Sequence, residues 1–199
     1  MGKIKILKCP IEGLYVIEPM VYEDARGYFM EMFNQKYISE AGLNTKFVQD
    51  NQSFSMKGVL RGLHFQKKHP QIKLIQVIEG AIFDVAVDIR TNSVTYGKGF
   101  GIKLSEKNKK QFYISEGFAH GFLVTSEKAK LLYKCSDFYH PDDECGVIWN
   151  DPNIGIEWPN MTKEQDNNYF LDDGTPLMLS EKDKAWKCLS MRLCHEVVY

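Results

Sequence analysis

The chain has 199 residues, with 25 basic and 26 acidic side chains and a formal net charge of −1. This length predicts a single domain, residues 1–199, with a core of its own. The balanced charge excludes a general electrostatic attraction to nucleic acid or to an anionic membrane, so neither is expected as a partner. An anionic ligand would have to be held by a local cluster of cations.

The first residues lack the apolar segment of a signal peptide, and no apolar run approaches the length that spans a membrane. The chain carries five cysteines, an odd number, and no Cys-x-x-Cys pair, which fits neither a disulfide framework nor a zinc knuckle. These features predict a reduced protein of the cytoplasm.

The first part of the chain predicts three short strands, at residues 4–7, 14–17 and 28–33. A turn before the third strand carries Arg26. Glu31 lies inside that aromatic and Met-rich strand, and it is either exposed on an outer face or placed there for a ligand.

Residues 34–41 predict the only early helix, which ends at Gly42. A polar segment follows at residues 47–53, and we interpret it as a loop that leads into the next strand.

The stretch from residue 58 to residue 73 organises the chain. Read as a strand, it places His64 on one face and Arg61 on the other, because side chains alternate along a strand. Pro70 and the charged residues before it break the strand, and a loop of this kind could bring Lys73 beside His64. A base that titrates near neutrality, next to a fixed cation, is what proton abstraction beside a carbonyl requires. The alternative is a core histidine and a surface lysine.

The middle of the chain predicts two strands over residues 73–90, around a turn at Glu79 and Gly80. The second of them has an apolar face, formed by Phe83, Val85, Val87 and Ile89. Further strands are predicted at residues 99–104, within 112–124 and at 130–139, followed by turns and a long irregular tail.

Two features of these later strands matter for function. His120 is bracketed by glycines, which permit a close approach of backbone. Tyr133 and Tyr139 are expected on one face of their strand. About ten short strands with regular turn signals and one weak helix predict an all-β antiparallel barrel or jelly-roll sandwich, whose mouth commonly holds one small ligand.

Barrels of the cupin kind usually bind a metal through a His-x-His pair, a following glutamate and a later histidine. Here Gln66 takes the place of the second histidine, and no glutamate follows before Glu79. His64 and His120 remain as inward imidazoles, and Lys73 would put a cation where a carboxylate ligand belongs, which makes a poor divalent-cation site. Acid–base chemistry without a metal or cofactor is therefore favoured.

Acid–base chemistry needs a carboxylate that orients the basic histidine and a weak acid on the opposite face. Asp84 is the candidate carboxylate for His120. Tyr133 and Tyr139 are both candidates for the acid.

Several segments resemble the dTDP-4-dehydrorhamnose 3,5-epimerase family, in order and at near-constant spacing. They are Arg-Gly-Leu-His-Phe-Gln at residues 61–66, Gly-Phe-Ala-His-Gly-Phe at 117–122, Tyr-Lys at 133–134, and residues 83–90, 149–152, 155–158 and 179–183. The match runs from about residue 14 to residue 183, whereas the loop at 67–70 and the C-terminal tail, 184–199, are not typical of the family.

The resemblance implies a metal-independent cupin-type jelly roll that forms a homodimer and acts on a nucleotide-linked 4-keto-6-deoxyhexose in deoxysugar biosynthesis. By the resemblance, His64 is the base and Asp183 its partner. Tyr133 is then the proton donor across the sugar ring, and Lys73 stabilises the enolate oxygen. The substrate-binding positions that it implies are Arg26, Glu31, Gln49, Asp50, Asn51, Arg61, His120, Glu144, Lys182 and Tyr139, the last of which stacks on the thymine base.

The resemblance leaves alternatives open. Relatives with nearly the same site epimerise only C3 or only C5, or use other nucleotide sugars. A non-enzymatic barrel that binds sugar nucleotides would keep the same arginines, whereas a metal-dependent oxygenase or isomerase is disfavoured by the missing glutamate ligand.

Overall fold

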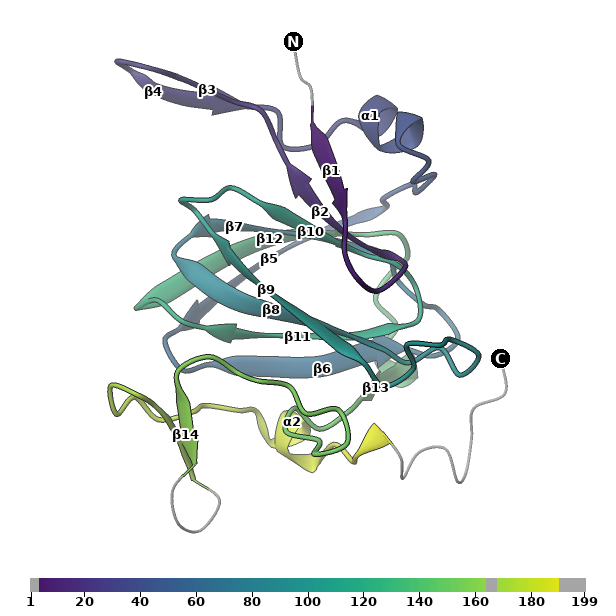
Figure 1. Ribbon diagram of the computed structural model, residues 1–199, viewed down its shortest axis with the longest axis vertical. Helices are drawn as coiled ribbons and strands as arrows, with labels where there is room; N and C mark the ends of the chain where they lie inside the picture. The colour runs from purple at the N-terminus through teal and green to yellow at the C-terminus, as the bar shows by residue number, and fades with distance from the viewer. Residues whose placement is uncertain (1–3, 164–167, 190–199) are drawn as a thin grey trace.

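Two antiparallel sheets, packed face to face, form the body of the protein in a computed structural model that describes residues 4–163 and 168–189 (Figure 1). The six-stranded sheet has the order β1 (Lys5–Lys8), β2 (Leu14–Glu18), β10 (Gln111–Ile114), β7 (Lys73–Glu79), β12 (Lys128–Cys135) and β5 (Gln49–Met56). The five-stranded sheet has the order β13 (Glu144–Gly146), β6 (Leu60–Gln66), β11 (Phe118–Val124), β8 (Ala81–Asp88) and β9 (Gly99–Ser105). The predicted all-β jelly-roll fold is confirmed.

The remaining elements lie outside the two sheets. The hairpin of β3 (Val21–Asp24) and β4 (Gly27–Met30) projects away from the body, and the helix α1 (Gln35–Glu40) lies close to its base (Figure 1). Later in the chain come the short 3-10 helix η1 (Pro141–Asp143), the strand pair β14 (Met161–Lys163) and β15 (Tyr169–Leu171), and the helix α2 (Glu181–Ala185). No helix within the described ranges is long and apolar enough to cross a membrane.

The strand β8 shows how the layers are built. Ile82 and Ala86 point into the core between the two sheets, where they join residues such as Phe112. The predicted apolar face of β8 points the other way, and Val85 and Val87 pack against Trp149 and other residues of the C-terminal part. Burial on both sides explains why the sheet needs the C-terminal segment as a third layer.

Three predicted boundaries are wrong. The polar segment expected to be a loop at 47–53 belongs largely to strand β5, which pairs with β12 along its whole length. The strand expected over 130–139 ends at Cys135, so Tyr139 lies in the following loop. The strand expected over 28–33 ends at Met30, before Glu31.

The tail also differs from the prediction, because it contains α2 and two short strands in place of a purely irregular segment. Trp186 lies edge-on to the ring of His64, and Leu189 is buried in the cluster beneath the five-stranded sheet. Of the tail predicted to be atypical, residues 190–199 lie outside the described residues.

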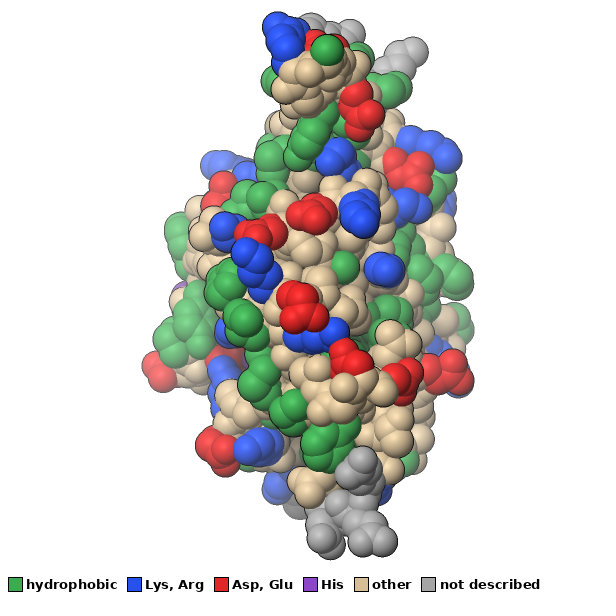
Figure 2. All heavy atoms as spheres, turned by 90° about the vertical axis from the view of Figure 1, so that its left-hand side faces the viewer, with side chains coloured by type: hydrophobic (Ala, Val, Ile, Leu, Met, Phe, Trp, Pro, Cys, Tyr) green, Lys and Arg blue, Asp and Glu red, His purple; other side chains and the backbone are tan. Residues whose placement is uncertain are grey.

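The surface agrees with the balanced charge of the sequence. Basic and acidic side chains are interspersed, with apolar side chains between them, over the face shown in Figure 2.

Candidate active site

A cavity of about 730 Å³ opens between the two sheets. Its walls come from both sheets, because β5, β7 and β12 contribute from one side and β6 and β11 from the other. Residues 178–183, which lead into α2, close the cavity along a third side. The cavity accounts for the polar composition of β5. Gln49, Asn51 and Ser53 alternate along the strand, so all three point to the same side and line the cavity.

Strand β6 brings both Arg61 and His64 to the cavity. The register of β6 on β11 shifts, with Arg61 opposite Phe122 but His64 opposite His120, so β6 has one residue more than its partner in between. The predicted strict alternation, with Arg61 and His64 on opposite faces, is therefore wrong at this point. A side chain at Gly62 would not fit, because a Cβ there would lie 2.6 Å from the Cα of Gly121.

His64 forms a pair with Asp183, which lies in the first turn of α2. Its Nε2 lies 2.5 Å from Oδ1 of Asp183, a buried carboxylate. Burial pushes the pKa of Asp183 upward, but the hydrogen bonds from His64 and Ser180 outweigh it, and the pKa of Asp183 is lowered. An ionised carboxylate in this position orients the imidazole and stabilises its protonated form.

Ser180 holds the carboxylate in place. It is the N-cap of α2, and its hydroxyl accepts a hydrogen bond of 3.1 Å from the backbone N–H of Asp183. The same hydroxyl donates to Oδ2 of Asp183 at 2.7 Å. Both oxygens of Asp183 are thus engaged, one by His64 and the other by Ser180.

Glu144 is a second carboxylate near His64, with Oε1 at 3.7 Å from Nδ1 of the ring. Its Oε2 accepts hydrogen bonds from the Tyr139 hydroxyl at 2.7 Å and from Nζ of Lys182 at 2.8 Å. Burial raises the pKa of Glu144, and these two bonds with the charge of His64 more than offset it, so the pKa is lowered. The bond to Glu144 in turn raises the pKa of Tyr139 to about 12.

His120 pairs with Asp84, as the sequence suggested. The His120 Nε2 lies 2.8 Å from Oδ1 of Asp84, whose side chain is fully buried. The other oxygen of Asp84 has no hydrogen-bond partner among the described residues. Lys73 also lines the cavity, and desolvation lowers the pKa of its ammonium although Cys135, Glu144 and Asp84 act in the opposite direction.

Tyr133 stands on the opposite wall from His64. It comes from β12 of the six-stranded sheet, whereas His64 comes from β6 of the other sheet, and both line the cavity. Burial raises the pKa of the Tyr133 phenol, so the group keeps its proton at neutral pH. The cavity thus offers an oriented imidazole on one wall and a protonated phenol on the other.

Most of the predicted site residues meet in this cavity. They are His64, Lys73, Tyr133 and Asp183, together with Gln49, Asn51, Arg61, His120, Tyr139, Glu144 and Lys182. Tyr133 and Tyr139 both line the cavity. They do not lie on one face of a single strand, as predicted, because Tyr139 lies beyond the end of β12.

Three predicted binding residues do not line the cavity of the single chain. Arg26 lies at the tip of the β3–β4 hairpin, 90% exposed and bound to Asp24. Asp50 points away from the cavity and pairs with Lys134. Glu31 follows the same hairpin, and its Oε1 is buried without a hydrogen-bond partner in the part of the chain that the structure describes.

Sequence reasoning missed Ser180. A serine three residues before an acidic residue is a typical signal of a helix N-terminus, and this signal was available in the segment 180–183. Sequence reasoning also missed Ser53 and Cys135, which line the cavity. Their strands have a polar or mixed composition, and this composition does not indicate which side chains face a cavity.

The chain is similar to known epimerases over nearly all its length. The family model described as dTDP-4-dehydrorhamnose 3,5-epimerase matches residues 8–191. The dTDP-4-dehydrorhamnose 3,5-epimerase of Methanothermobacter thermautotrophicus is 51% identical over 189 residues, which cover 95% of this chain and 96% of the relative.

Solved structures agree with this similarity. The dTDP-6-deoxy-D-glucose-3,5-epimerase of Legionella pneumophila, solved in complex with dTDP-4-keto-L-rhamnose, superposes with a TM-score of 0.85 at 45% identity, covering 95% of this chain and 94% of that one. The dTDP-4-dehydrorhamnose 3,5-epimerase of Elizabethkingia anophelis gives a TM-score of 0.84 at 46% identity, covering 95% and 98%.

Proposed function

Because this chain belongs to the dTDP-4-dehydrorhamnose 3,5-epimerase family and is therefore an isomerase, we propose that it inverts C3 and C5 of a dTDP-linked 4-keto-6-deoxyhexose in deoxysugar biosynthesis. The observation that carries this proposal is the placement of His64 and Tyr133 on opposite walls of one cavity, with Lys73 between the sheets. An epimerisation needs a base on one face of a carbon and a proton donor on the other face.

The proposed reaction begins with proton removal. The C4 ketone acidifies the hydrogens on C3 and C5, because the electron pair left on carbon delocalises onto the ketone oxygen. His64 takes the proton, and the ionised Asp183 stabilises the resulting imidazolium. Lys73 stabilises the enolate oxygen.

The second half of the proposed reaction returns a proton from the opposite face. Tyr133 donates to the carbon, the C4 ketone re-forms, and the configuration at that carbon is inverted. The phenol suits this role because burial keeps it protonated before the reaction. After one inversion His64 carries the proton that it removed and Tyr133 has lost its own. Return of the His64 proton to solvent and reprotonation of Tyr133 from solvent restore the pair, which would then act at the other carbon.

For substrate binding we propose that Arg61 and Lys182 neutralise the diphosphate and that Tyr139 stacks on the thymine base. The remaining polar side chains of the cavity, Gln49, Asn51, His120 and Glu144, then hold the sugar and the nucleoside. The presence of Arg61 and Lys182 in the lining of the same cavity supports this arrangement.

We further propose that the protein is a homodimer and works in the cytoplasm. The β3–β4 hairpin projects from the body and carries Arg26, with Glu31 just beyond it (Figure 1). In a dimer these two residues would reach the substrate of the second copy, with Asp50 near the same surface. Exposed apolar side chains support such a contact, among them Tyr28 and Phe29 on the hairpin and Phe54 and Met56 on β5. The four cysteines among the described residues are free thiols, which suits a reducing compartment.

Solvent exchange tests the proposed function. The protein is incubated with dTDP-4-keto-6-deoxyglucose in deuterated water, in parallel with other nucleotide 4-keto sugars, and deuterium is located by NMR. We expect deuterium at both C3 and C5 and inversion at both. Exchange at one carbon would instead identify a one-carbon epimerase, and no exchange with any member of the panel would refute the proposal.

A further inference from the structure

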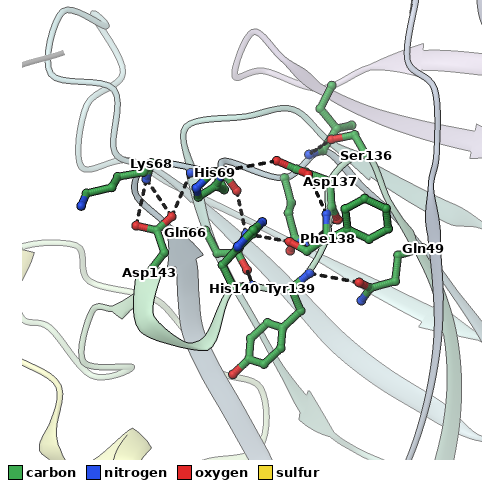
Figure 3. Close-up of polar contacts among 12 residues, drawn as sticks. Gln49, Gln66, Lys68, His69, Ser136, Asp137, Phe138, Tyr139, His140 and Asp143 are labelled. Carbon is green, nitrogen blue, oxygen red and sulfur yellow. Dashed lines mark hydrogen bonds and ion pairs between the residues drawn. The ribbon is translucent and has the colours of Figure 1, made fainter.

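Three side chains of metal-ligating type meet in two loops next to the cavity, away from the proposed acid–base residues. His69 lies in the loop between β6 and β7, whereas Asp137 and His140 lie in the segment between β12 and η1. Their nearest ligand atoms all lie within 4.8 Å of one another. Figure 3 shows Asp137 directed at His69, with the ring of His140 beside both.

The backbone that carries these side chains is held from several directions. The buried side chain of Gln66 donates to the carbonyl of His69 at 2.7 Å and accepts from the backbone N–H of His140 at 2.8 Å, so it bridges the two segments (Figure 3). Asp143 accepts from the backbone N–H of His69 at 2.8 Å, and Gln71 donates to the carbonyl of Asp137 at 2.8 Å. These contacts fix the backbone positions of the three residues, and Oδ1 of Asp137 also accepts a hydrogen bond from the backbone N–H of Phe138 at 2.8 Å.

The side chains interact mainly with each other. The Nδ1 of His69 lies 3.7 Å from Oδ2 of Asp137, and the rings of His69 and His140 stack with centroids 3.9 Å apart and an angle of 17° between planes. Two imidazoles and a carboxylate thus face one another on a fixed backbone, and their nitrogen and oxygen atoms are of the types that ligate a metal ion.

We propose that His69, Asp137 and His140 bind one divalent transition-metal ion of the Zn²⁺ type. Imidazole nitrogen and carboxylate oxygen bind Zn²⁺ at about 2.0–2.2 Å, so tetrahedral ligand atoms stand about 3.4 Å apart. The ligand atoms now lie within 4.8 Å of one another, so they have to move closer to reach that spacing. Three protein ligands leave the fourth position of a tetrahedral ion to water.

Binding of the ion requires the ring stack to open. The lone pair of an imidazole lies in the plane of its ring, and two nearly parallel planes cannot both contain one ion. One ring therefore rotates until the two planes cross at the metal. The stacked pair is the ion-free arrangement, and it keeps both rings next to the position that the ion takes.

The ion would tie together two segments that border the cavity. Gln66 and Gln71 on one side and Tyr139 on the other all line the cavity, and Tyr139 lies between two of the three ligand-bearing positions in sequence. Fixing Asp137 and His140 to His69 restricts the backbone on both sides of Tyr139. This consequence for substrate binding rests on the proposed function, in which Tyr139 stacks on the base, whereas ion binding itself does not.

Equilibrium dialysis of the untagged full chain against Zn²⁺, after stripping with a chelator, tests the site without any substrate. All proteins carry His195→Ala, so that this histidine, which lies outside the described residues, does not contribute. We expect one bound ion per chain. Asp137→Asn and His140→Ala should each weaken its binding at least ~10-fold, because loss of even an outer-shell partner costs that much.

The matched control is Asp142→Asn, which removes the same charge from an exposed aspartate in the adjoining helix η1. It should bind Zn²⁺ as tightly as the parent, and the thermal midpoints of all ion-free variants should agree. Equal Zn²⁺ affinity in the parent, Asp137→Asn and His140→Ala would overturn the site.

Kinetics then test whether the bound ion orders Tyr139. We expect Zn²⁺ to lower KM without changing kcat in the parent and to have no effect in Asp137→Asn. If the parent binds Zn²⁺ and its KM stays unchanged, the proposed ordering of Tyr139 by the ion is wrong. A lack of epimerase activity would instead refute the proposed function, so the two failures can be told apart.

Discussion

Two histidine–aspartate pairs share the cavity, and they are built in different ways. His120 and Asp84 come from adjacent strands of one sheet, so pairing of β11 with β8 is enough to bring them together. His64 receives Asp183 from the short helix α2, far along the chain, and the pair forms only when the C-terminal segment docks on β6.

The two aspartates differ in the same way. Both oxygens of Asp183 are engaged, by His64 and by Ser180, whereas Asp84 is fully buried with one oxygen that has no hydrogen-bond partner among the described residues. An oriented and satisfied carboxylate suits a histidine that gains a positive charge during a reaction. This difference supports the proposal that His64, whose partner comes from the docked C-terminal segment, is the base, and that His120, whose partner comes from the same sheet, has a binding role.

The largest expected difference between the pairs is in catalysis. His64→Asn should reduce deuterium exchange by ~10²- to 10⁴-fold, because it removes the proposed general base. His120→Asn, the matched change in the other pair, should act mainly on KM. Exchange rates and KM for both variants, with circular dichroism to confirm folding, make the comparison. Equal losses of exchange would show that the two pairs are not divided in this way.

Tyr133→Phe sharpens the assignment of the base. Removing the proposed proton donor on the opposite wall should lower inversion by ~10²-fold or more while exchange on the His64 side persists. Adding His120→Asn should leave this exchange in place, and adding His64→Asn should abolish it. NMR of the recovered sugar distinguishes exchange from inversion. Full epimerase activity of Tyr133→Phe would remove Tyr133 from the role of donor.

Ser180→Ala should have a smaller effect on catalysis, through the position of α2 and of Asp183 against His64. It removes both the N-cap of α2 and the hydrogen bond to Oδ2 of Asp183, and loss of a cap costs about 0.5–2 kcal/mol of stability. We expect a fall in kcat of about 10-fold, measured by steady-state kinetics, with a thermal midpoint a few degrees lower. Ser180→Thr keeps the hydroxyl and should restore kcat, whereas a threonine variant as slow as the alanine variant would argue against positioning of Asp183.

The smallest expected effect is a pH dependence of stability. The pKa of Asp183 is lowered in the folded chain, so its contact with His64 stabilises the fold above the ordinary aspartate pKa and is lost as the pH falls through the folded value. The difference in thermal midpoint between the parent and Asp183→Asn should therefore shrink below about pH 4. Thermal unfolding of both proteins over a series of pH values measures it, and a difference that grows on acidification would contradict a lowered pKa of Asp183.

The comparison also shows where sequence reasoning succeeds. The sequence alone determined the all-β class and the two strands around Glu79 and Gly80, because alternation of apolar and polar side chains is a local property. It also pointed to Asp84 as the partner of His120. The residues themselves also suggested His64 beside Lys73 as a base with a cation, and Tyr133 or Tyr139 as the acid. The resemblance to the epimerase family added Asp183 and most of the substrate-binding positions, and eleven of the fourteen predicted residues line one cavity.

Tertiary structure decided the features that depend on distant partners. Gln49, Asn51 and Ser53 form a strand although they are polar, because that strand faces a polar cavity and pairs with β12. Arg61 and His64 share a wall only through the register shift against β11, which no property of β6 alone reveals. The partner of His64 and the covering of β8 both come from the C-terminal segment, because burial and charge pairing are satisfied by whatever the fold brings close, not by neighbours in sequence.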